Sequence, residues 1–304
     1  MAEGWKRLVE QGLVAFSLDR LARRRLDPSG VILAWHNIVP EGETAAGDLS
    51  LHTDQLRFGE QLDVLAETHD VITLEEAGDA AREPRDRPWA AVTFDDAYRG
   101  ALTAGLDELA RRGMPGTVMV APGILGTATW WDLLAPPGGG PVPEAVRRHC
   151  LDALQGRLEP VLAWARAEGH VPVEPPEHAV PATEDEVVVA GRRPGVSLAV
   201  HTWSHPNLAV LSPEECADEY ARSRAWVEAR ALRFSDWLAY PYGLYAEPAV
   251  EEARRTFAGA VRVEGGLWVR RGRRVAEEAL VPRVNVPRGL TREGFRLRVA
   301  GLLG

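Results

Sequence analysis

The chain has 304 residues, of which 45% are hydrophobic and 26% are charged, as expected of a protein that buries a large core. Its formal net charge of -9 disfavours nucleic acid as a partner, because such binding needs a basic surface. No apolar run has the length of a transmembrane segment. The two cysteines, Cys150 and Cys216, are far apart and predict neither a disulfide framework nor a cysteine metal site.

Residues 1–30 carry apolar side chains at helical spacing and end in a cluster of arginines. This pattern predicts an amphipathic helix that lies on the rest of the protein, on a partner, or as a peripheral contact on a membrane surface. The segment lacks the apolar core and cleavage site of a secretory signal, so we expect a cytoplasmic location.

Beyond residue 30, short β-like runs alternate with helical stretches. The apolar pattern predicts strands at 31–35, 89–94, 117–120, 196–200, 237–239 and 258–263. It predicts helices at 54–67, 98–112, 213–230 and 247–256, and a closing helix at 291–303 with Thr291 as its N-cap. This alternation indicates βαβ units around a parallel sheet. We therefore expect an α/β fold over residues 31–304, a distorted (β/α) barrel with seven strands.

Residues 135–190 interrupt the alternation. They begin with the turn-rich run PPGGGPVP, continue through a helical stretch at 144–167, and reach a proline-dense run at 171–181. We predict a helical insertion on one side of the barrel, not a second domain.

The first of three motifs that follow predicted strands is AVTFDD at 91–96, which ends in Asp95 and Asp96. At the carboxyl end of a barrel strand, these acids would lie where such folds place catalytic groups. Adjacent side chains on an extended chain point apart, so one carboxylate can bind a metal while the other faces a reacting water. Alternatively, the two acids cap the helix that follows.

The second motif, VHTWSHP at 200–206, places His201 and His205 four residues apart, which suits two imidazoles on one metal ion. An isolated pair of this kind is as often structural. Combined with one carboxylate, it gives a catalytic type of ligand set with positions open for water. In the third motif, LAYPYG at 238–243, Pro241 and Tyr242 form a tight turn. That turn either brings backbone N–H groups to the barrel mouth or merely stiffens the chain.

These motifs, in this order at strand ends, resemble those of the polysaccharide deacetylases (the NodB homology domain, carbohydrate esterase family 4). The resemblance runs from about residue 31 to residue 285. It implies that Asp95 is the general base and that the backbone N–H of Tyr242 helps to bind the oxyanion. It also implies that Asp96, His201 and His205 bind a divalent metal, usually zinc.

The sequence departs from the family pattern in two places, and the first departure concerns the residue that orients the base. The family's third motif usually begins with an arginine that orients the base, whereas Ala239 and Tyr240 precede Pro241 here. Arg283, in VPRVN, could supply this guanidinium from another strand end and hold Asp95 ionised. Alternatively, Arg283 is a surface ion-pair residue.

The second departure concerns the general acid. The family commonly has a histidine near the last strand, but LVPRVNVP at 280–287 contains none. His36, after the first predicted strand, is the best replacement, and His52 is a poorer one. Without an acid, the chain could be slow, could use the metal water alone, or could be a relative that only binds its ligand.

Three further residues are candidates for binding sugar: Trp131 and Asp132 in the run WWD, and Trp268 in GGLWV. Sugar rings stack on aromatic faces, and a carboxylate can bind their hydroxyls, although ordinary packing explains any single tryptophan equally well. The predicted function is metal-dependent removal of an N-acetyl group from a saccharide in cell-surface polysaccharide or glycolipid synthesis. The alternatives are a deformylase or O-acetyl esterase with the same metal site, and a non-catalytic carbohydrate-binding relative.

Overall fold

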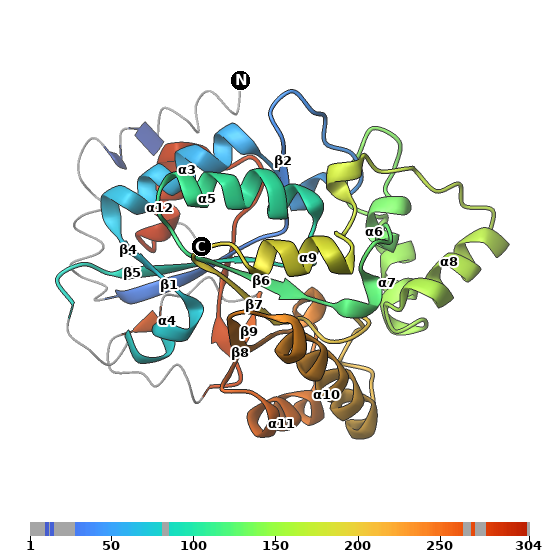
Figure 1. The fold of residues 1–304 in the computed structure, drawn as a ribbon. Helices are drawn as coiled ribbons and strands as arrows, with labels where there is room; N and C mark the ends of the chain where they lie inside the picture. Colours follow the sequence, from blue (N-terminus) through green and yellow to red (C-terminus); the bar gives the residue numbers. More distant parts are fainter. Residues whose placement is uncertain are drawn as a thin grey trace.

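The computed structural model describes residues 10–11, 13–14, 28–80, 85–263, 269–270 and 278–302. Its centre is one sheet of mostly parallel strands with helices packed around it (Figure 1). The strands of this sheet are β1 (Pro28–Trp35), β4 (Asp70–Ile72), β5 (Trp89–Phe94), β6 (Gly116–Val120), β7 (Val196–Val200), β8 (Phe234–Ala239), β9 (Gly259–Arg262), β10 (Val269–Arg270), β11 (Val281–Pro282) and β12 (Val284–Asn285). Hydrogen bonds link them in the order β10-β1-β5-β6-β7-β8-β9-β11, while β12 pairs with β1 and β4 pairs with β5.

The last two strand segments nearly close the sheet into a barrel. β11 runs parallel to β9, β12 runs parallel to β1, and one residue, Arg283, separates them. The N–H of Arg283 donates to the carbonyl of Arg262, and the N–H of Val286 donates to that of Ala34, both at 3.0 Å. The predicted distorted (β/α) barrel is confirmed. The predicted number of seven strands is wrong, because the hydrogen-bonded path has eight, including the two-residue antiparallel β10 beside β1.

Side chains alternate along each strand between an outer core under the helices and the barrel interior. The interior set from the strands is Ile32, Ile72, Trp89, Ala91, Met119, Ala199, Trp237, Ala239, Val261 and Val281, and side chains of α4 (Leu74–Ala80) join it. Continuing the same alternation to the carboxyl ends of the strands puts four polar residues on the interior side. These residues are His36, Asp95, His201 and Arg283. The strand pattern therefore brings the chemistry together at one mouth of the barrel.

The remaining helices of the barrel are α3 (Gln55–Thr68), α5 (Leu106–Arg111), α9 (Glu184–Gly191), α10 (Pro213–Arg230), α11 (Glu247–Thr256) and α12 (Arg292–Val299). The predicted bounds of α10 and α11 are confirmed, and Thr291 caps α12 as predicted by accepting from Gly294 N–H. The chain is helical from residue 99 to residue 111, close to the helix predicted at 98–112. Within this stretch a π-helical turn, η2 (Ala101–Gly105), precedes α5, and this irregularity was not predicted.

A small two-stranded sheet, β2 (Asn37–Val39) and β3 (His52–Asp54), was not predicted. Each strand has three residues, too few for a recognisable alternation. β2 runs close to η2, and a Cβ on Gly100 would lie 2.1 Å from the carbonyl oxygen of Ile38. Glycine is required at this crossing. Short 3-10 turns complete the connections: η1 (Leu49–Leu51), η3 (Pro122–Ile124), η4 (Glu177–Ala179) and η5 (Pro241–Gly243).

The segment predicted as an insertion, together with the residues just before it, forms α6 (Trp130–Leu133), α7 (Glu144–Asp152) and α8 (Leu158–Ala167) on one side of the barrel (Figure 1). These helices share a small apolar cluster that includes Trp130, Cys150 and Val161. The helical stretch predicted at 144–167 consists of two helices, α7 and α8, because the chain turns sharply between them. Gln155 and Gly156 have φ of 55° and 69° there.

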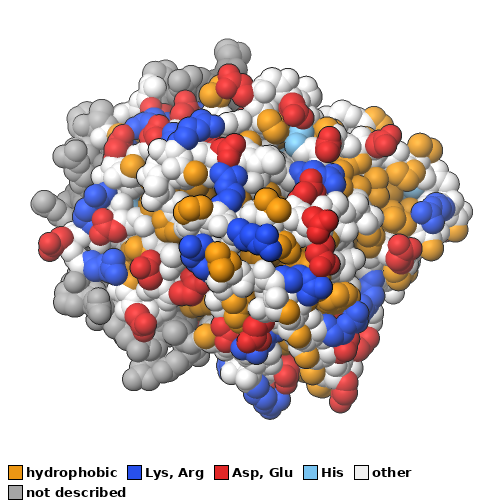
Figure 2. Space-filling model, viewed as in Figure 1, with side chains coloured by type: hydrophobic (Ala, Val, Ile, Leu, Met, Phe, Trp, Pro, Cys, Tyr) orange, Lys and Arg blue, Asp and Glu red, His pale blue; other side chains and the backbone are white. Residues whose placement is uncertain are grey.

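Several predictions fall on residues that the structure does not describe. Most of the predicted N-terminal helix and its membrane contact, as well as Trp268, lie outside the described residues and stay predictions. No helix in the described part of the chain is both long and apolar enough to cross a bilayer. On the face shown in Figure 2, charges of both signs are interspersed, and apolar side chains gather over the side occupied by α7 and α8.

Candidate active site

Asp95, which follows β5, is paired with a fully buried arginine. The two terminal nitrogens of Arg283 donate to Asp95 Oδ1 at 2.7 Å and Oδ2 at 2.6 Å, and Nη1 also donates to Thr93 Oγ1 at 3.1 Å. Burial alone would raise the pKa of Asp95, but the charge and hydrogen bonds of Arg283, helped by His201, outweigh it and hold the pKa below its ordinary value. The predicted contact between Arg283 and Asp95 is confirmed, and the alternative of a surface ion pair is wrong.

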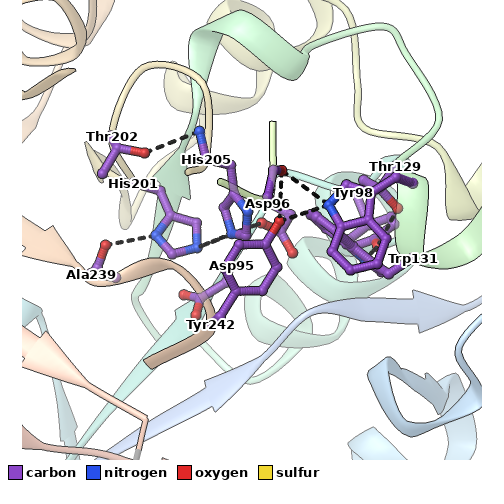
Figure 3. Close-up of polar contacts among 12 residues, drawn as sticks. Asp95, Asp96, Tyr98, Thr129, Trp131, His201, Thr202, His205, Ala239 and Tyr242 are labelled. Carbon is purple, nitrogen blue, oxygen red and sulfur yellow. Dashed lines mark hydrogen bonds and ion pairs between the residues drawn. The ribbon is translucent and has the colours of Figure 1, made fainter. Parts of the chain in front are cut away.

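Asp96, His201 and His205 converge on one point beside this pair (Figure 3). The two histidine Nε2 atoms are 3.1 Å apart, and they lie 3.5 Å and 3.2 Å from Asp96 Oδ1. One donor atom from each residue lies within 4.8 Å of the other two. The prediction that these three side chains meet at the barrel mouth is confirmed.

The chemistry of this donor set fits a divalent metal ion. His201 Nδ1 lies 2.8 Å from the carbonyl oxygen of Ala239, so Nδ1 carries the hydrogen and the lone pair of Nε2 faces the other two residues. Asp96 Oδ1 is buried without a hydrogen-bond partner among the described residues, which is costly unless a cation lies beside it. Burial lowers the pKa of both His201 and His205, which keeps their imidazoles neutral and able to bind metal at neutral pH.

The backbone of the three motifs is strained. Among the described residues, six non-glycine residues have positive φ; four of these lie in the motifs, and a fifth, Ala97, directly follows the first motif. These five are Asp96 (66°), Ala97 (51°), Thr202 (64°), His205 (54°) and Tyr242 (56°). Such conformations cost on the order of 1–3 kcal/mol each and concentrate at functional sites, where the surrounding structure enforces them. The sharp bends turn the side chains of different strand ends toward one another.

Two aromatic rings cover His205. The ring centroids of Trp131 and Tyr242 lie 4.9 Å and 4.5 Å from that of His205, and 5.5 Å from each other. Trp130 Nε1 donates to the hydroxyl of Tyr242 at 2.9 Å. Trp131 is 4% exposed, so most of its surface already contacts protein. Its predicted stacking against a sugar ring stays a prediction.

The predicted proline–tyrosine turn is present as η5. The N–H groups of Gly243 and Leu244 close it by donating to the carbonyls of Tyr240 and Pro241 at 3.1 Å and 3.0 Å. Neither bond uses the N–H of Tyr242. The role of that N–H in binding an oxyanion stays a prediction.

The buried carboxylate of Asp132 links several segments of the protein by hydrogen bonds and is not a ligand for sugar. It is fully buried, and its Oδ1 accepts from Asp48 N–H at 2.8 Å and lies 3.0 Å from His52 Nε2. Its Oδ2 accepts from the hydroxyls of Tyr98 and Thr129 at 2.6 Å and 2.9 Å. Since both oxygens are occupied by protein donors, the prediction that this carboxylate binds sugar hydroxyls is wrong.

The two histidines considered as general acid lie in different surroundings. His52 is fully buried, and its ring nitrogens contact Asp132 and the side-chain amide of Asn37, at 3.0 Å and 2.9 Å, so it is not available as an acid. His36 is partly exposed and follows β1 on the interior side. Burial lowers its pKa to about 4, against the opposing effect of Asp95. A neutral ring at pH 7 argues against the acid role, because only a protonated group can release a proton.

Sequence reasoning missed Glu219, a buried glutamate in the middle of α10. Its carboxylate accepts from the backbone N–H groups of Trp203 and Ser204, which lie between His201 and His205. A signal was present, since Glu219 lies on the same helical face as the apolar Cys216 and Tyr220. A charged residue on a core-facing stripe indicates a buried partner.

Comparison with solved structures shows that this fold is found in known deacetylases. A deacetylase from Streptococcus pyogenes, PplD, in complex with acetate is similar with a TM-score of 0.61 and 18% sequence identity, over 89% of this chain and 97% of that one. IcaB from Ammonifex degensii is similar with a TM-score of 0.61 and 19% identity, over 90% and 97% of the two chains. The putative polysaccharide deacetylase BA0330 from Bacillus anthracis is similar with a TM-score of 0.61 and 15% identity, over 88% and 68%.

A comparison with curated protein sequences found no match. The family model for polysaccharide deacetylase matches residues 82–258, more than half of the chain. The matched segment contains the acidic pair, the histidine loop and the proline–tyrosine turn, and it excludes His36 and Arg283. On this match and on the geometry of the three motifs, the chain belongs to the polysaccharide deacetylase family.

Proposed function

We propose that this protein is a metal-dependent hydrolase that removes the N-acetyl group from an amino sugar or glycan. The observation that carries the proposal is the buried ion pair of Asp95 and Arg283 beside the donor set of Asp96, His201 and His205. Amide hydrolysis requires a base for the attacking water and a positive charge for the developing oxyanion. Asp95, paired with Arg283, would be the base. A metal ion held by Asp96, His201 and His205 would supply the positive charge.

Asp96, His201 and His205 would hold the metal, and we propose zinc because two imidazoles and a carboxylate form a common catalytic zinc site. When bound, the ion supplies Lewis acidity, which lowers the pKa of a water toward neutrality and polarises the acetyl carbonyl. Asp95 accepts the proton of the attacking water. Arg283 fixes the plane of that carboxylate through two hydrogen bonds and keeps it ionised.

The same Asp95 then returns the proton to the leaving amine in our proposal. Its pKa is held low, so the protonated form is a good donor, whereas the pKa of His36, about 4, leaves that ring neutral. The N–H of Tyr242 in η5 assists by donating to the oxyanion. The rings of Trp131 and Tyr242 would form the wall of the acetyl-binding site next to His205.

The proposed substrate is an acetylated saccharide used in cell-surface polysaccharide or glycolipid synthesis, and the proposed location is the cytoplasm. The family match supports the carbohydrate class. The PplD structure contains acetate, the product proposed here. The rival activities on the same site are removal of a formyl group and cleavage of an O-acetyl ester, and the third rival is a relative that binds carbohydrate without turnover.

Acid release from three matched saccharides tests the proposal: an N-acetylated, an N-formylated and an O-acetylated form of the same sugar. We expect acetate from the N-acetyl form, loss of release with a chelator, and recovery with zinc. Formate release that exceeds acetate release, or preference for the ester, would assign one of the rival hydrolases. Binding without release from any of the three would assign the non-catalytic relative.

Two neighbouring substitutions separate the base from the metal ligand. Asp95→Asn should keep zinc binding and lower kcat by about 10²–10⁴-fold, the range expected for loss of a positioned base. Asp96→Asn is the matched variant and should lose zinc as well as activity. Zinc content measured on the purified variants decides, since loss of zinc from Asp95→Asn would make Asp95 a ligand.

A further inference from the structure

The loop between the two metal-binding histidines is strained and needs support from outside. Thr202 and His205 have φ of 64° and 54°, in the left-handed region that non-glycine residues avoid at a cost of roughly 1–2 kcal/mol each. Within the loop, the N–H of His205 donates to Thr202 Oγ1 at 3.1 Å. Contacts from other elements must select this conformation over relaxed ones in which the imidazoles point elsewhere.

One carboxylate behind the loop makes these contacts. Glu219 Oε2 accepts from the backbone N–H groups of Trp203 and Ser204 at 2.9 Å and 2.8 Å, and its Oε1 accepts from Ser204 Oγ at 2.6 Å. Glu219 is 3% exposed and comes from the middle of an 18-residue helix, α10. A rigid helix therefore holds the two residues that lie between Thr202 and His205.

The insertion completes this arrangement. Arg157, in the turn between α7 and α8, donates from Nη1 to Glu219 Oε1 at 3.0 Å and to Ser204 Oγ at 2.8 Å. The carbonyl of Gln155 in the same turn accepts from Asn207 N–H at 2.7 Å, just beyond the loop. The buried charge of Glu219 thus has a partner, and the insertion contacts the histidine loop through Arg157 and Gln155.

We propose that Glu219 is a positioning residue for the metal site, which selects the loop conformation in which His201 and His205 converge. Arg157 is its charge partner and orients it. This inference rests on the proposed metal-dependent function. Groups that orient metal ligands typically change metal affinity by about 10–100-fold when they are removed, and we expect an effect of this size.

The test is a zinc titration of the full-length protein against a chromophoric chelator, with each variant first made metal-free. Glu219→Ala should weaken zinc binding by about 10–100-fold. Glu219→Gln should weaken it by less, because an amide oxygen can still accept from the N–H groups of Trp203 and Ser204. The control is Glu228→Ala on the same helix, whose exposed carboxylate pairs with Arg224, and its zinc affinity should equal that of the wild type.

Thermal unfolding of the metal-free proteins distinguishes a positioning role from a purely structural one. A lower Tm in Glu219→Ala with unchanged zinc affinity would overturn the inference. If that variant does not fold, Glu219→Gln and Arg157→Ala decide, and wild-type zinc affinity in both would also overturn it. Wild-type protein that binds zinc but releases no acetate would contradict the proposed deacetylation, while a zinc affinity that depends on Glu219 would still support this inference.

Discussion

Arg283 and Asp95 are separated by 188 positions in the sequence, yet the two buried side chains neutralise each other. A buried ion pair adds little net stability, because the cost of removing two charges from water offsets most of their attraction. Its location at the mouth of the barrel, beside three potential metal ligands, makes a chemical purpose the better explanation. Removing one partner should therefore affect both stability and catalysis.

Arg283→Met should lower kcat/KM at every pH and shift the acidic limb of the pH–rate profile to higher pH. Asp95 acts as a base when it is deprotonated, and Arg283 is the main group that lowers its pKa against the effect of burial. Without the guanidinium, the pKa rises, so protonation inactivates the base at a higher pH. The free energy of unfolding should fall by about 3–5 kcal/mol.

Arg283→Lys is the control for this prediction. The ammonium keeps the charge but cannot donate to both carboxylate oxygens in one plane. Activity should be reduced while the acidic limb stays near its wild-type position. An acidic limb in Arg283→Met that coincides with that of the wild type would mean that another group sets it.

His36→Gln should leave the alkaline limb of the pH–rate profile in place. Burial lowers the pKa of His36 to about 4, so its ring is neutral over the pH range where an acid with an ordinary pKa would titrate. Profiles of both proteins with one N-acetylated substrate provide the measurement. Disappearance of the alkaline limb in the variant would restore His36 as the acid and remove this task from Asp95.

At the scale of secondary structure, long periodic segments were predictable and short ones were not. Strands β5 and β7 and helices α10 and α11 have the predicted bounds, because the strands are continuous buried runs of mostly apolar residues and the helices bury one face each. β2, β3 and β4 have three residues each, and tertiary contacts rather than local pattern determine them. The π-helical turn η2 lies where β2 crosses close to Gly100, a contact that the local sequence does not contain.

The site residues also divide into those that local motifs predict and those whose contacts come from distant segments. The motif residues were predictable because their spacing follows from strand ends that meet at one edge. Arg283 was predictable because it lies at another strand end, from which its guanidinium can replace the arginine missing before Pro241. Asp132 was misassigned because its partners Asp48, His52 and Tyr98 come from distant segments. Residue type alone does not distinguish a carboxylate saturated by protein donors from one that is free to bind a ligand.

Asp132→Ala tests this structural role, in which the carboxylate of α6 binds groups of β3 and of the segment that precedes η2. The variant leaves buried donors on Asp48, Tyr98 and Thr129 without their acceptor, so the free energy of unfolding should fall by about 3 kcal/mol. Urea denaturation provides the measurement. Asp152→Ala, on the exposed side of α7, is the control and should change stability by less than about 0.5 kcal/mol. Equal stabilities of the two variants would contradict the structural role.

At the scale of the molecule, closure of the barrel and assembly of the site are one event. The segment that joins β9 to β1 through β11 and β12 also carries Arg283 to Asp95. Helix α6 contributes Trp131, whose ring packs against His205, and the turn between α7 and α8 contributes Arg157, which binds Glu219. The candidate metal site is consequently held by both ends of the described chain and by the insertion, and we expect its occupancy to affect global stability.

Zinc should raise the Tm of the whole protein. Without a cation, burial and the neighbouring Asp95 raise the pKa of Asp96, and its Oδ1 has no hydrogen-bond partner among the described residues. A ligand that binds the folded state alone stabilises it by about 2.7 kcal/mol at a free concentration of 100 Kd. For a chain of this size, this corresponds to a rise of roughly 5 °C. Scanning calorimetry of the metal-free protein, with and without zinc, measures the shift.

The zinc-induced rise in Tm should depend on pH. Zinc and protons compete for the same three side chains, and burial beside Asp95 raises the pKa of Asp96, so this carboxylate takes up a proton at a higher pH than an ordinary aspartate. The zinc-induced rise in Tm should therefore shrink as pH decreases and should be absent at every pH in Asp96→Asn. A rise of equal size in that variant would place the zinc that stabilises the protein at another site.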